Sequence, residues 1–251
     1  MCTRASVLAA PELAGAGANA TDIARRLGIP RTTVRDWLRG QLPKHVRDGM
    51  LGTLNCERCG RLAHRYDELT DSYVYILGLY LGDGWISRHR RGVYRLRIAL
   101  DARYPGIIED AAAAMQDVRG GTVHVRRRPD KNCSDVSAYW RSWPCLLPQH
   151  GTGRKHEREV VLTAWQSRLV DRWPEQLVRG LIHCDGCRSQ NTGTNWSWPR
   201  YSFKQLSDDI RTIFCDACDR LGLRWTRAGT TIYVSRKADV ALLDEFIGPK
   251  R

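Results

Sequence analysis

A nearly unbroken apolar stretch runs over residues 73–82, and segments that alternate apolar and polar residues follow it. Long apolar runs favour buried helices, and period-two alternation is typical of strands with one buried face. The expected elements are a helix over 72–84, strands over 85–87 and 93–100, a helix over 105–118, strands over 122–126 and 136–141, and a helix over 160–174. The pattern predicts an α+β unit of the order α-β-β-α-β-β-α.

The same order of elements recurs in the second half of the chain. Residues 76–84 read Ile-Leu-Gly-Leu-Tyr-Leu-Gly-Asp-Gly, and residues 178–186 read Val-Arg-Gly-Leu-Ile-His-Cys-Asp-Gly. Both copies have the form apolar-x-Gly-Leu-apolar-x-small-Asp-Gly, and their aspartates, Asp83 and Asp185, lie 102 residues apart. We therefore expect a duplicated unit with pseudo-two-fold symmetry.

Small residues in each copy fall on one helix face. Gly78 and Gly82 are four residues apart, as are Gly180 and Cys184, and residues four apart lie above one another on a helix. Two such helices can approach until their backbones touch. This contact would bring both helix ends, with both terminal carboxylates, to one point.

The amino-terminal residues predict two helices joined by a turn. Asn19 or Thr21 can cap a helix that Gly28 ends, and Pro30 opens the next helix. The pattern D-I-A-x-x-L-G-I-x-x-x-T-V-x-x-W resembles the helix-turn-helix of bacterial regulators and resolvase-type arms. An ordinary helical hairpin is the alternative. The second helix would bury Val34, Trp37 and Leu38 and present to the DNA major groove Arg31, Thr32, Thr33, Arg35 and Asp36, with Arg39 near phosphate.

Residues 43–71 have the proline, glycine and charge content of a linker. Within them, Asn-Cys56-Glu-Arg-Cys59-Gly has the form of a zinc knuckle, in which two thiolates converge on one ion. One knuckle supplies only two zinc ligands. His45 and His64 are candidates to complete the site, although their spacing fits no standard finger. Two thiols without a metal are the alternative.

The charge balance favours a polyanionic partner. The chain of 251 residues carries 40 Lys and Arg against 27 Asp and Glu, a formal net charge of +13. Such an excess favours nucleic acid as the partner, with a merely basic surface as the alternative. The chain has no apolar run of about eighteen residues and no basic-then-apolar leader. We therefore expect no membrane contact, and a bacterial cytoplasmic protein that associates with the nucleoid when bound to DNA.

A duplicated α-β-β-α-β-β-α unit whose first helix ends in Asp-Gly resembles the LAGLIDADG homing endonucleases in their single-chain form. The resemblance covers residues 72–248, with one repeat over 72–160 and another over 161–251, behind a helix-turn-helix domain over 1–42. It implies two motif helices packed at the pseudo-two-fold axis and two curved antiparallel sheets that form a saddle on double-stranded DNA. A monomer is expected, because both motifs lie in one chain.

The resemblance also implies a site for Mg²⁺ or Mn²⁺. The last acidic residue of each motif, Asp83 or Asp185, would bind the metal over a scissile phosphate, with the carbonyl groups of Gly82 and Cys184 as additional ligands. Two carboxylates at helix ends suit Mg²⁺, a hard ion that retains water ligands. The other acidic position of the motif, which is not the metal ligand in the family, is occupied by Leu81 and His183.

Basic residues near each phosphate are a further feature of the family. Lys155, in the loop before the second motif helix, occupies one such place, and Arg236 or Lys237, after the last strand, occupies the other. A cation there would polarise the attacking water or stabilise the phosphate charge, with a solvated surface charge as the alternative. Candidate DNA contacts along the strands are Tyr94, Arg95, Arg97, Arg126, Arg127, Arg200 and Lys204.

For the remaining cysteines and tryptophans, a place in the core is the alternative to a functional role. The pairs Cys184/Cys187 and Cys215/Cys218 have the spacing of a zinc ribbon, but they fall on or beside apolar helices, which favours a place in the core. Trp196 and Trp198, in a polar stretch, are the candidates for base stacking. The tryptophans expected in the core are Trp140, Trp143, Trp165, Trp173 and Trp225.

Two functions follow from these patterns. The first is a site-specific, Mg²⁺-dependent double-strand DNA endonuclease of the homing type. The second is a transcription regulator that binds DNA on a LAGLIDADG scaffold without cleaving it, because some bacterial sporulation regulators combine a degenerate LAGLIDADG domain with a helix-turn-helix. A module that binds no nucleic acid is disfavoured by the charge and the motifs together.

Overall fold

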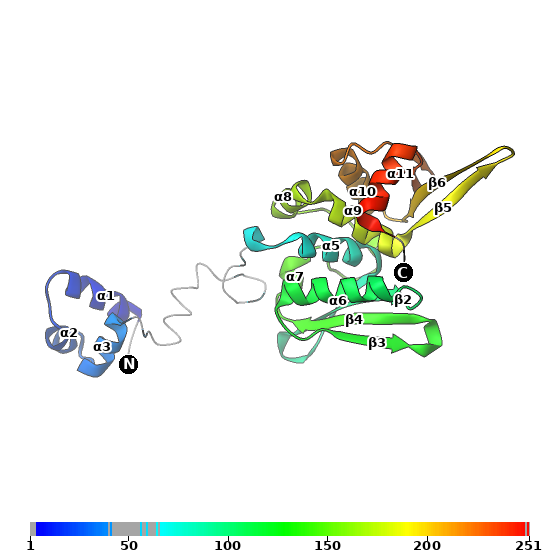
Figure 1. Ribbon diagram of the computed structural model, residues 1–251. Helices are drawn as coiled ribbons and strands as arrows, with labels where there is room; N and C mark the ends of the chain where they lie inside the picture. The colour runs from blue at the N-terminus through cyan, green and yellow to red at the C-terminus, as the bar shows by residue number, and fades with distance from the viewer. Residues whose placement is uncertain are drawn as a thin grey trace. The chain divides into compact units, whose positions relative to one another are not determined.

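The structure, a computed structural model, describes residues 4–39, 41, 56, 59, 64, 66–248 and 250 (Figure 1). The chain divides into two compact units, residues 1–64 and 65–251. His45, a candidate zinc ligand, lies outside the described residues. Within the described ranges, each helix is too short or too polar to cross a lipid bilayer.

The first unit contains the predicted helix-turn-helix. Its helices are α1 (Arg4–Gly15), α2 (Ala20–Leu27) and α3 (Arg31–Leu38). Asn19 caps α2, because its side chain accepts hydrogen bonds from the backbone N–H groups of Thr21 and Asp22 at 3.0 and 3.1 Å. Gly28 ends α2 in the left-handed region, with a φ of 63°. The cap and the stop that the sequence predicts are therefore both present.

A small core holds these three helices together. It consists of Val7, Ala10, Ile23, Ile29, Val34 and Trp37. Leu38, which was expected to face inward, is instead 40% exposed. Leu38 is the last residue of α3, and Val34 and Trp37 already fill the core side of this helix.

The second unit is a duplicated α-β-β-α-β-β-α arrangement, as the sequence predicts. The first repeat contains α5 (Asp71–Asp83), β1 (Gly84–Arg88), β2 (Tyr94–Asp101), α6 (Pro105–Arg119), β3 (His124–Arg128), β4 (Cys133–Trp140) and α7 (Trp143–Leu146). After α8 (Ala164–Arg172), the second contains α9 (Pro174–Asp185), β5 (Gly186–Gly193), β6 (Trp196–Lys204), α10 (Asp208–Arg220), β7 (Trp225–Ala228), β8 (Thr231–Val234) and α11 (Lys237–Ile247). The described part of this unit also contains short 3₁₀ turns, namely η1 (Tyr66–Glu68), η2 (Arg90–Gly92), η3 (Pro129–Lys131) and η4 (Lys155–Glu157).

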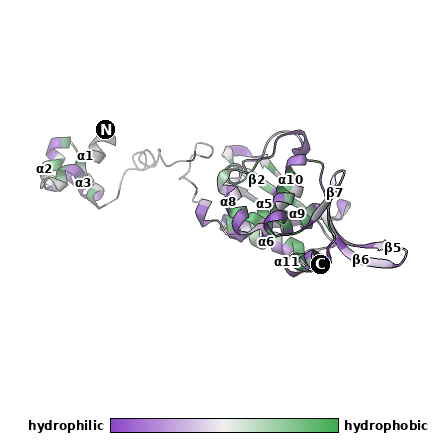
Figure 2. Ribbon diagram, turned by 90° about the horizontal axis from the view of Figure 1, so that it is seen from above, coloured by the Kyte–Doolittle hydropathy of each residue, from purple (hydrophilic) through white to green (hydrophobic). Residues whose placement is uncertain are grey.

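Each repeat forms one four-stranded antiparallel sheet. The strand orders are β1-β2-β4-β3 and β5-β6-β8-β7, so the two sheets have equivalent topologies. Helix α6 lies along the first sheet, and α10 and α11 lie along the second (Figure 1). The β5–β6 hairpin is polar and projects from the apolar helices at the centre of the unit (Figure 2). The predicted α+β fold is thus confirmed.

One expected helix is shorter than predicted. The segment 160–174 was expected to be helical throughout, but α8 begins only at Ala164 and ends at Arg172, before the second motif helix α9 begins at Pro174. The backbone N–H of Val160 instead donates to the Asp209 carboxylate at 2.8 Å. Thr163 and Gln166 then form a reciprocal capping box, which fixes the start of α8.

Helices α5 and α9 pack so closely that their backbones touch. A Cβ atom placed on Gly78 would lie 2.7 Å from the carbonyl oxygen of Leu177, and one placed on Gly180 would lie 2.5 Å from that of Tyr75. Both distances are shorter than a real Cβ contact allows. The predicted approach through small residues is therefore confirmed, and it occurs in the middle of the largest core of the described chain.

Replacing Gly78 by alanine is expected to destabilise the second unit. A methyl group at this position meets backbone rather than a flexible side chain, so the helices must separate, and overpacking of this kind costs about 1–3 kcal/mol. Gly15→Ala, in α1, is the matched control because nothing lies within 4 Å of its added Cβ. Calorimetry on both full-length variants measures the difference. An unchanged melting temperature for Gly78→Ala would contradict the described contact.

Candidate active site

The two motif aspartates are the last residues of the two packed helices. Asp83 ends α5 and Asp185 ends α9. The helix contact continues to these ends, since a Cβ atom on Gly82 would lie 2.5 Å from Cβ of Cys184 and 3.2 Å from a carboxylate oxygen of Asp185. A small residue in each motif therefore lets the helix ends, and their acidic groups, come together.

The surroundings of the two carboxylates raise the pKa of both. Desolvation and, after it, the negative charge of Asp83 raise the pKa of Asp185 to about 6. Desolvation by burial also raises the pKa of Asp83, although Lys155, a hydrogen bond with Cys184, and Lys250 oppose this change. Asp83 remains exposed and Asp185 half-exposed, so both carboxylates can be reached from solvent. A cation placed between them would favour the charged forms of both.

Lys155 lies against the end of the first motif helix. Its ammonium group donates to the carbonyl oxygens of Tyr80 and Gly82, the latter at 2.9 Å, and lies 4.9 Å from the centre of the Tyr80 ring. Burial lowers the pKa of Lys155 to about 8, while the charges of the motif residues act in the opposite direction. This lysine and Gly82 were both predicted as site residues, and the structure brings them into contact.

Two residues that the sequence did not indicate lie beside the second motif. The ammonium group of Lys250 donates to the carbonyl oxygens of Gly186 and His183, the latter at 3.3 Å. The side-chain amide of Gln205 donates to the Asp185 carboxylate at 2.8 Å. Lys250 thus stands at the second helix end as Lys155 stands at the first. Arg236 and Lys237, which the sequence suggested for this place, are exposed residues at the start of α11.

The histidine of the second motif, His183, lies in the core. The hydroxyl of Tyr75 donates to Nδ1 of His183 at 2.8 Å, and Nε2 of the ring donates to the carbonyl oxygen of Ile247 at 3.3 Å. Desolvation lowers the pKa of His183 to about 4, which keeps the ring neutral near pH 7. His183 therefore links α5, α9 and the end of α11. Leu81, at the equivalent position of the first motif, is fully buried.

The outer face of each sheet is the face opposite the buried core. Strand side chains alternate between faces, and the core side of β2 carries Leu96, Ile98 and Leu100. Arg95 and Arg97 therefore lie on the outer face, where the register places Arg126 of β3 beside β4. Among the other predicted contacts, Tyr94 packs against the core, and Arg127 points to the opposite face of β3 from Arg126.

The second sheet has an equivalent outer face with exposed aromatic rings. Tyr201 and Phe203 of β6 are buried, so alternation places Arg200 and Lys204 on the outer face. The Arg200 guanidinium lies 4.5 Å from the centre of the Tyr233 ring. Trp198 is 55% exposed and Trp196 45% exposed on the same face. The tryptophans expected in the core, Trp140, Trp143, Trp165, Trp173 and Trp225, pack in or against it.

Helix α3 presents the predicted polar residues to solvent. Arg31, Thr32, Arg35 and Arg39 are exposed and Thr33 is half-exposed, while Val34 and Trp37 are buried. The two cysteines of α10, Cys215 and Cys218, are also buried, as core packing predicts. Cys187, which was expected in the core with them, is instead exposed on β5.

Comparison with known proteins identifies similar chains for both units. Residues 2–42 match a family model described as a homeodomain-like domain. No curated protein matches the chain. The N-terminal LAGLIDADG domain of DUF199/WhiA is a similar solved structure, 12% identical, with 73% of this chain and 86% of that chain covered and a TM-score of 0.43.

Two homing endonucleases are also among the similar solved structures. Mesophilic variants of the homing endonuclease I-DmoI are 13% identical, with 71% of this chain and 92% of that chain covered and a TM-score of 0.48. The LAGLIDADG homing endonuclease I-SmaMI bound to cleaved DNA is 10% identical, with 72% of this chain and 84% of that chain covered and a TM-score of 0.44.

Proposed function

We propose that the second unit is a divalent-metal-dependent endonuclease that cleaves double-stranded DNA at a specific site. The observation that carries this proposal is the meeting of Asp83 and Asp185 at the ends of two helices in backbone contact. Such an arrangement places two carboxylates beside each other despite their mutual repulsion. A pair of adjacent carboxylates is expected where a cation binds.

The donor groups suit Mg²⁺ or Mn²⁺. Asp83 and Asp185 offer hard carboxylate oxygens. Burial raises the pKa of each, so a bound cation would favour the charged forms that can act as its ligands. Both side chains reach solvent, which leaves room for water ligands and for a phosphate. When bound, the ion supplies charge stabilisation and an activated water for phosphodiester hydrolysis.

The neighbouring side chains have separate roles in this proposal. Lys155 and Lys250 each hold a motif helix end through carbonyl oxygens and place a positive charge near the carboxylates. A fixed cation at this position stabilises charge that develops on the phosphate. Gln205 orients the Asp185 carboxylate by a hydrogen bond. The carbonyl of Gly82 already accepts from Lys155, and with that of Cys184 it remains a candidate additional metal ligand.

The outer faces of the two sheets are the proposed DNA-contacting surfaces. Arginine forks suit phosphates and guanine edges, and Arg95, Arg97 and Arg126 supply them on the first sheet. Arg200, Lys204 and the exposed tryptophans supply cations and stacking surfaces on the second. Helix α3 would add contacts through Arg31, Thr32, Thr33, Arg35 and Arg39.

The carboxylate pair is expected to destabilise the metal-free chain at high pH, and a bound metal ion is expected to compensate for this loss. Folding raises the pKa of Asp185 to about 6, so the folded chain holds this proton more tightly than the unfolded chain does. The contribution of this proton to the free energy of unfolding is therefore fully present below about pH 4 and is lost as the pH rises through about 6. Asp185→Asn is expected to stabilise the metal-free chain at pH 8 by about 1 kcal/mol, after allowance for solvent screening. Mg²⁺ should raise the melting temperature of the wild type at pH 8 more than at pH 5.

Thermal unfolding with and without Mg²⁺ measures these effects. Glu109→Gln, at an exposed position of α6, is the control and should behave as the wild type. A lower melting temperature for metal-free Asp185→Asn at pH 8, or a wild type that Mg²⁺ stabilises equally at both pH values, would argue against a shared metal site.

The function itself is tested by cleavage of selected DNA. Fragments bound by the full-length protein in Ca²⁺ are isolated from a genomic library and then incubated with the protein and Mg²⁺. We expect specific double-strand cleavage by the wild type. The Asp83→Asn/Asp185→Asn variant should lose cleavage by at least about 100-fold, because the charge-stabilising site is removed, while it still binds the same fragments.

The same assay tests whether Lys155 and Lys250 contribute more to cleavage than an exposed surface cation does. It also distinguishes an endonuclease from a regulator that only binds DNA. Lys155→Gln and Lys250→Gln should lower the cleavage rate more than Arg236→Gln, whose side chain is exposed at the start of α11. The regulator alternative is favoured by the helix-turn-helix unit. It predicts Mg²⁺-independent, sequence-specific binding with no cleavage of any bound fragment, and that outcome would refute the proposed endonuclease.

A further inference from the structure

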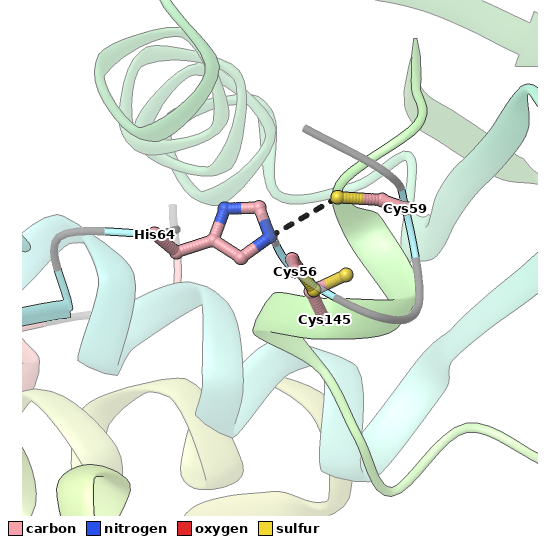
Figure 3. Close-up of side chains that lie close together, drawn as sticks. All are labelled: Cys56, Cys59, His64 and Cys145. Carbon is pink, nitrogen blue, oxygen red and sulfur yellow. Dashed lines mark hydrogen bonds between the residues drawn. The ribbon is translucent and has the colours of Figure 1, made fainter. Parts of the chain in front are cut away.

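A cluster of thiol and imidazole groups lies outside the acidic site. Cys56, Cys59, His64 and Cys145 each offer one ligand atom, and these atoms all lie within 4.8 Å of one another (Figure 3). The sequence indicated Cys56 and Cys59 as zinc ligands, with His64 as a candidate third. Cys145 could not be chosen from the sequence, because it lies 86 residues beyond Cys59 along the chain.

We infer that these four side chains form a structural zinc site. In a tetrahedral zinc site with Zn–S bonds of about 2.3 Å and Zn–N bonds of about 2.0 Å, the ligand atoms lie roughly 3.5–3.8 Å apart. Sγ of Cys59 and Nε2 of His64 are 3.4 Å apart, close to this spacing. The remaining ligand atoms need only a small contraction from their 4.8 Å limit to surround one ion.

The chemistry of the four groups selects zinc and a structural role. Thiolates and imidazole are the ligands that zinc prefers, whereas Mg²⁺ and Ca²⁺ prefer oxygen. Three cysteines and one histidine fill all four positions of a tetrahedral ion and leave none for a substrate. The site is therefore distinct in chemistry from the carboxylates of Asp83 and Asp185.

The fourth ligand is held in place by contacts within the protein. Cys145 is 4% exposed and lies in α7. The indole N–H of Trp143 donates to the carbonyl oxygen of Ala138 at 3.0 Å. The hydroxyl of Tyr73 donates to the carbonyl oxygen of Leu146 at 2.6 Å. Gln166 in turn donates to the Tyr73 hydroxyl at 2.8 Å. These buried hydrogen bonds fix α7, so Cys145 presents a thiol at a defined position.

Metal analysis of the full-length protein tests the site independently of DNA cleavage. Protein purified without chelator from zinc-supplemented cells should contain about one zinc ion per chain by mass spectrometry. Cys56→Ser, His64→Ala and Cys145→Ser should each lower the zinc retained after dialysis against a chelator several-fold. His64→Cys should retain zinc, because a fourth thiolate replaces the imidazole. Cys133→Ser and Cys187→Ser, which alter cysteines outside the cluster, are the matched controls and should retain zinc.

A spectroscopic measurement covers the case in which Cys145→Ser fails to fold. The wild type loaded with Co²⁺ should show the ligand-field bands of a tetrahedral ion and thiolate charge-transfer bands whose intensity corresponds to three sulfur ligands. A zinc content far below one per chain, or a Cys56–Cys59 disulfide in place of the metal, would overturn the proposal. Loss of zinc in Cys56→Ser and His64→Ala but full retention in folded Cys145→Ser would refute Cys145 as the fourth ligand.

Discussion

The backbone contact between α5 and α9 is the constraint on which the rest of the second unit depends. Gly78 and Gly180 allow it, because any side chain at either position would meet the backbone of the facing helix. The contact brings the two sheets to opposite sides of one helix pair and brings the two helix ends together. Fold and site thus have the same origin, because the small residues that permit the packing lie in the same two motifs as the aspartates that the packing brings together.

The two halves of the site are similar in plan and different in detail. A lysine holds carbonyl oxygens at each helix end, but Lys155 comes from the segment between the repeats and Lys250 from the end of the chain. Gln205 contacts only the second carboxylate, whereas Arg103, at the equivalent position 102 residues earlier, pairs with Asp101. Duplication therefore supplies the symmetric framework, and later differences make the surroundings of Asp83 and Asp185 unequal.

The fold was accessible from the sequence because its signals are local and repeated. Apolar periodicity located the strands and most helices, and the repeated motif indicated that Asp83 and Asp185 meet. Lys250 and Gln205 were missed because their contacts depend on tertiary structure. Arg236 and Lys237 follow the last strand in sequence and lie at the start of α11. The chain turns after this helix at Gly248, which has a φ of 68°, and Lys250 then contacts α9. Cys145 was missed for the same reason.

The central claim is that the two helix ends form one metal-binding site, and anomalous diffraction tests it most directly. Crystals of the full-length protein with a selected DNA fragment and Mn²⁺ should give an anomalous peak beside the carboxylates of Asp83 and Asp185, next to a DNA phosphate. The Asp83→Asn/Asp185→Asn variant should give no peak at this position. Carboxylates that point apart, or Mn²⁺ bound only elsewhere in the complex, would contradict the claim.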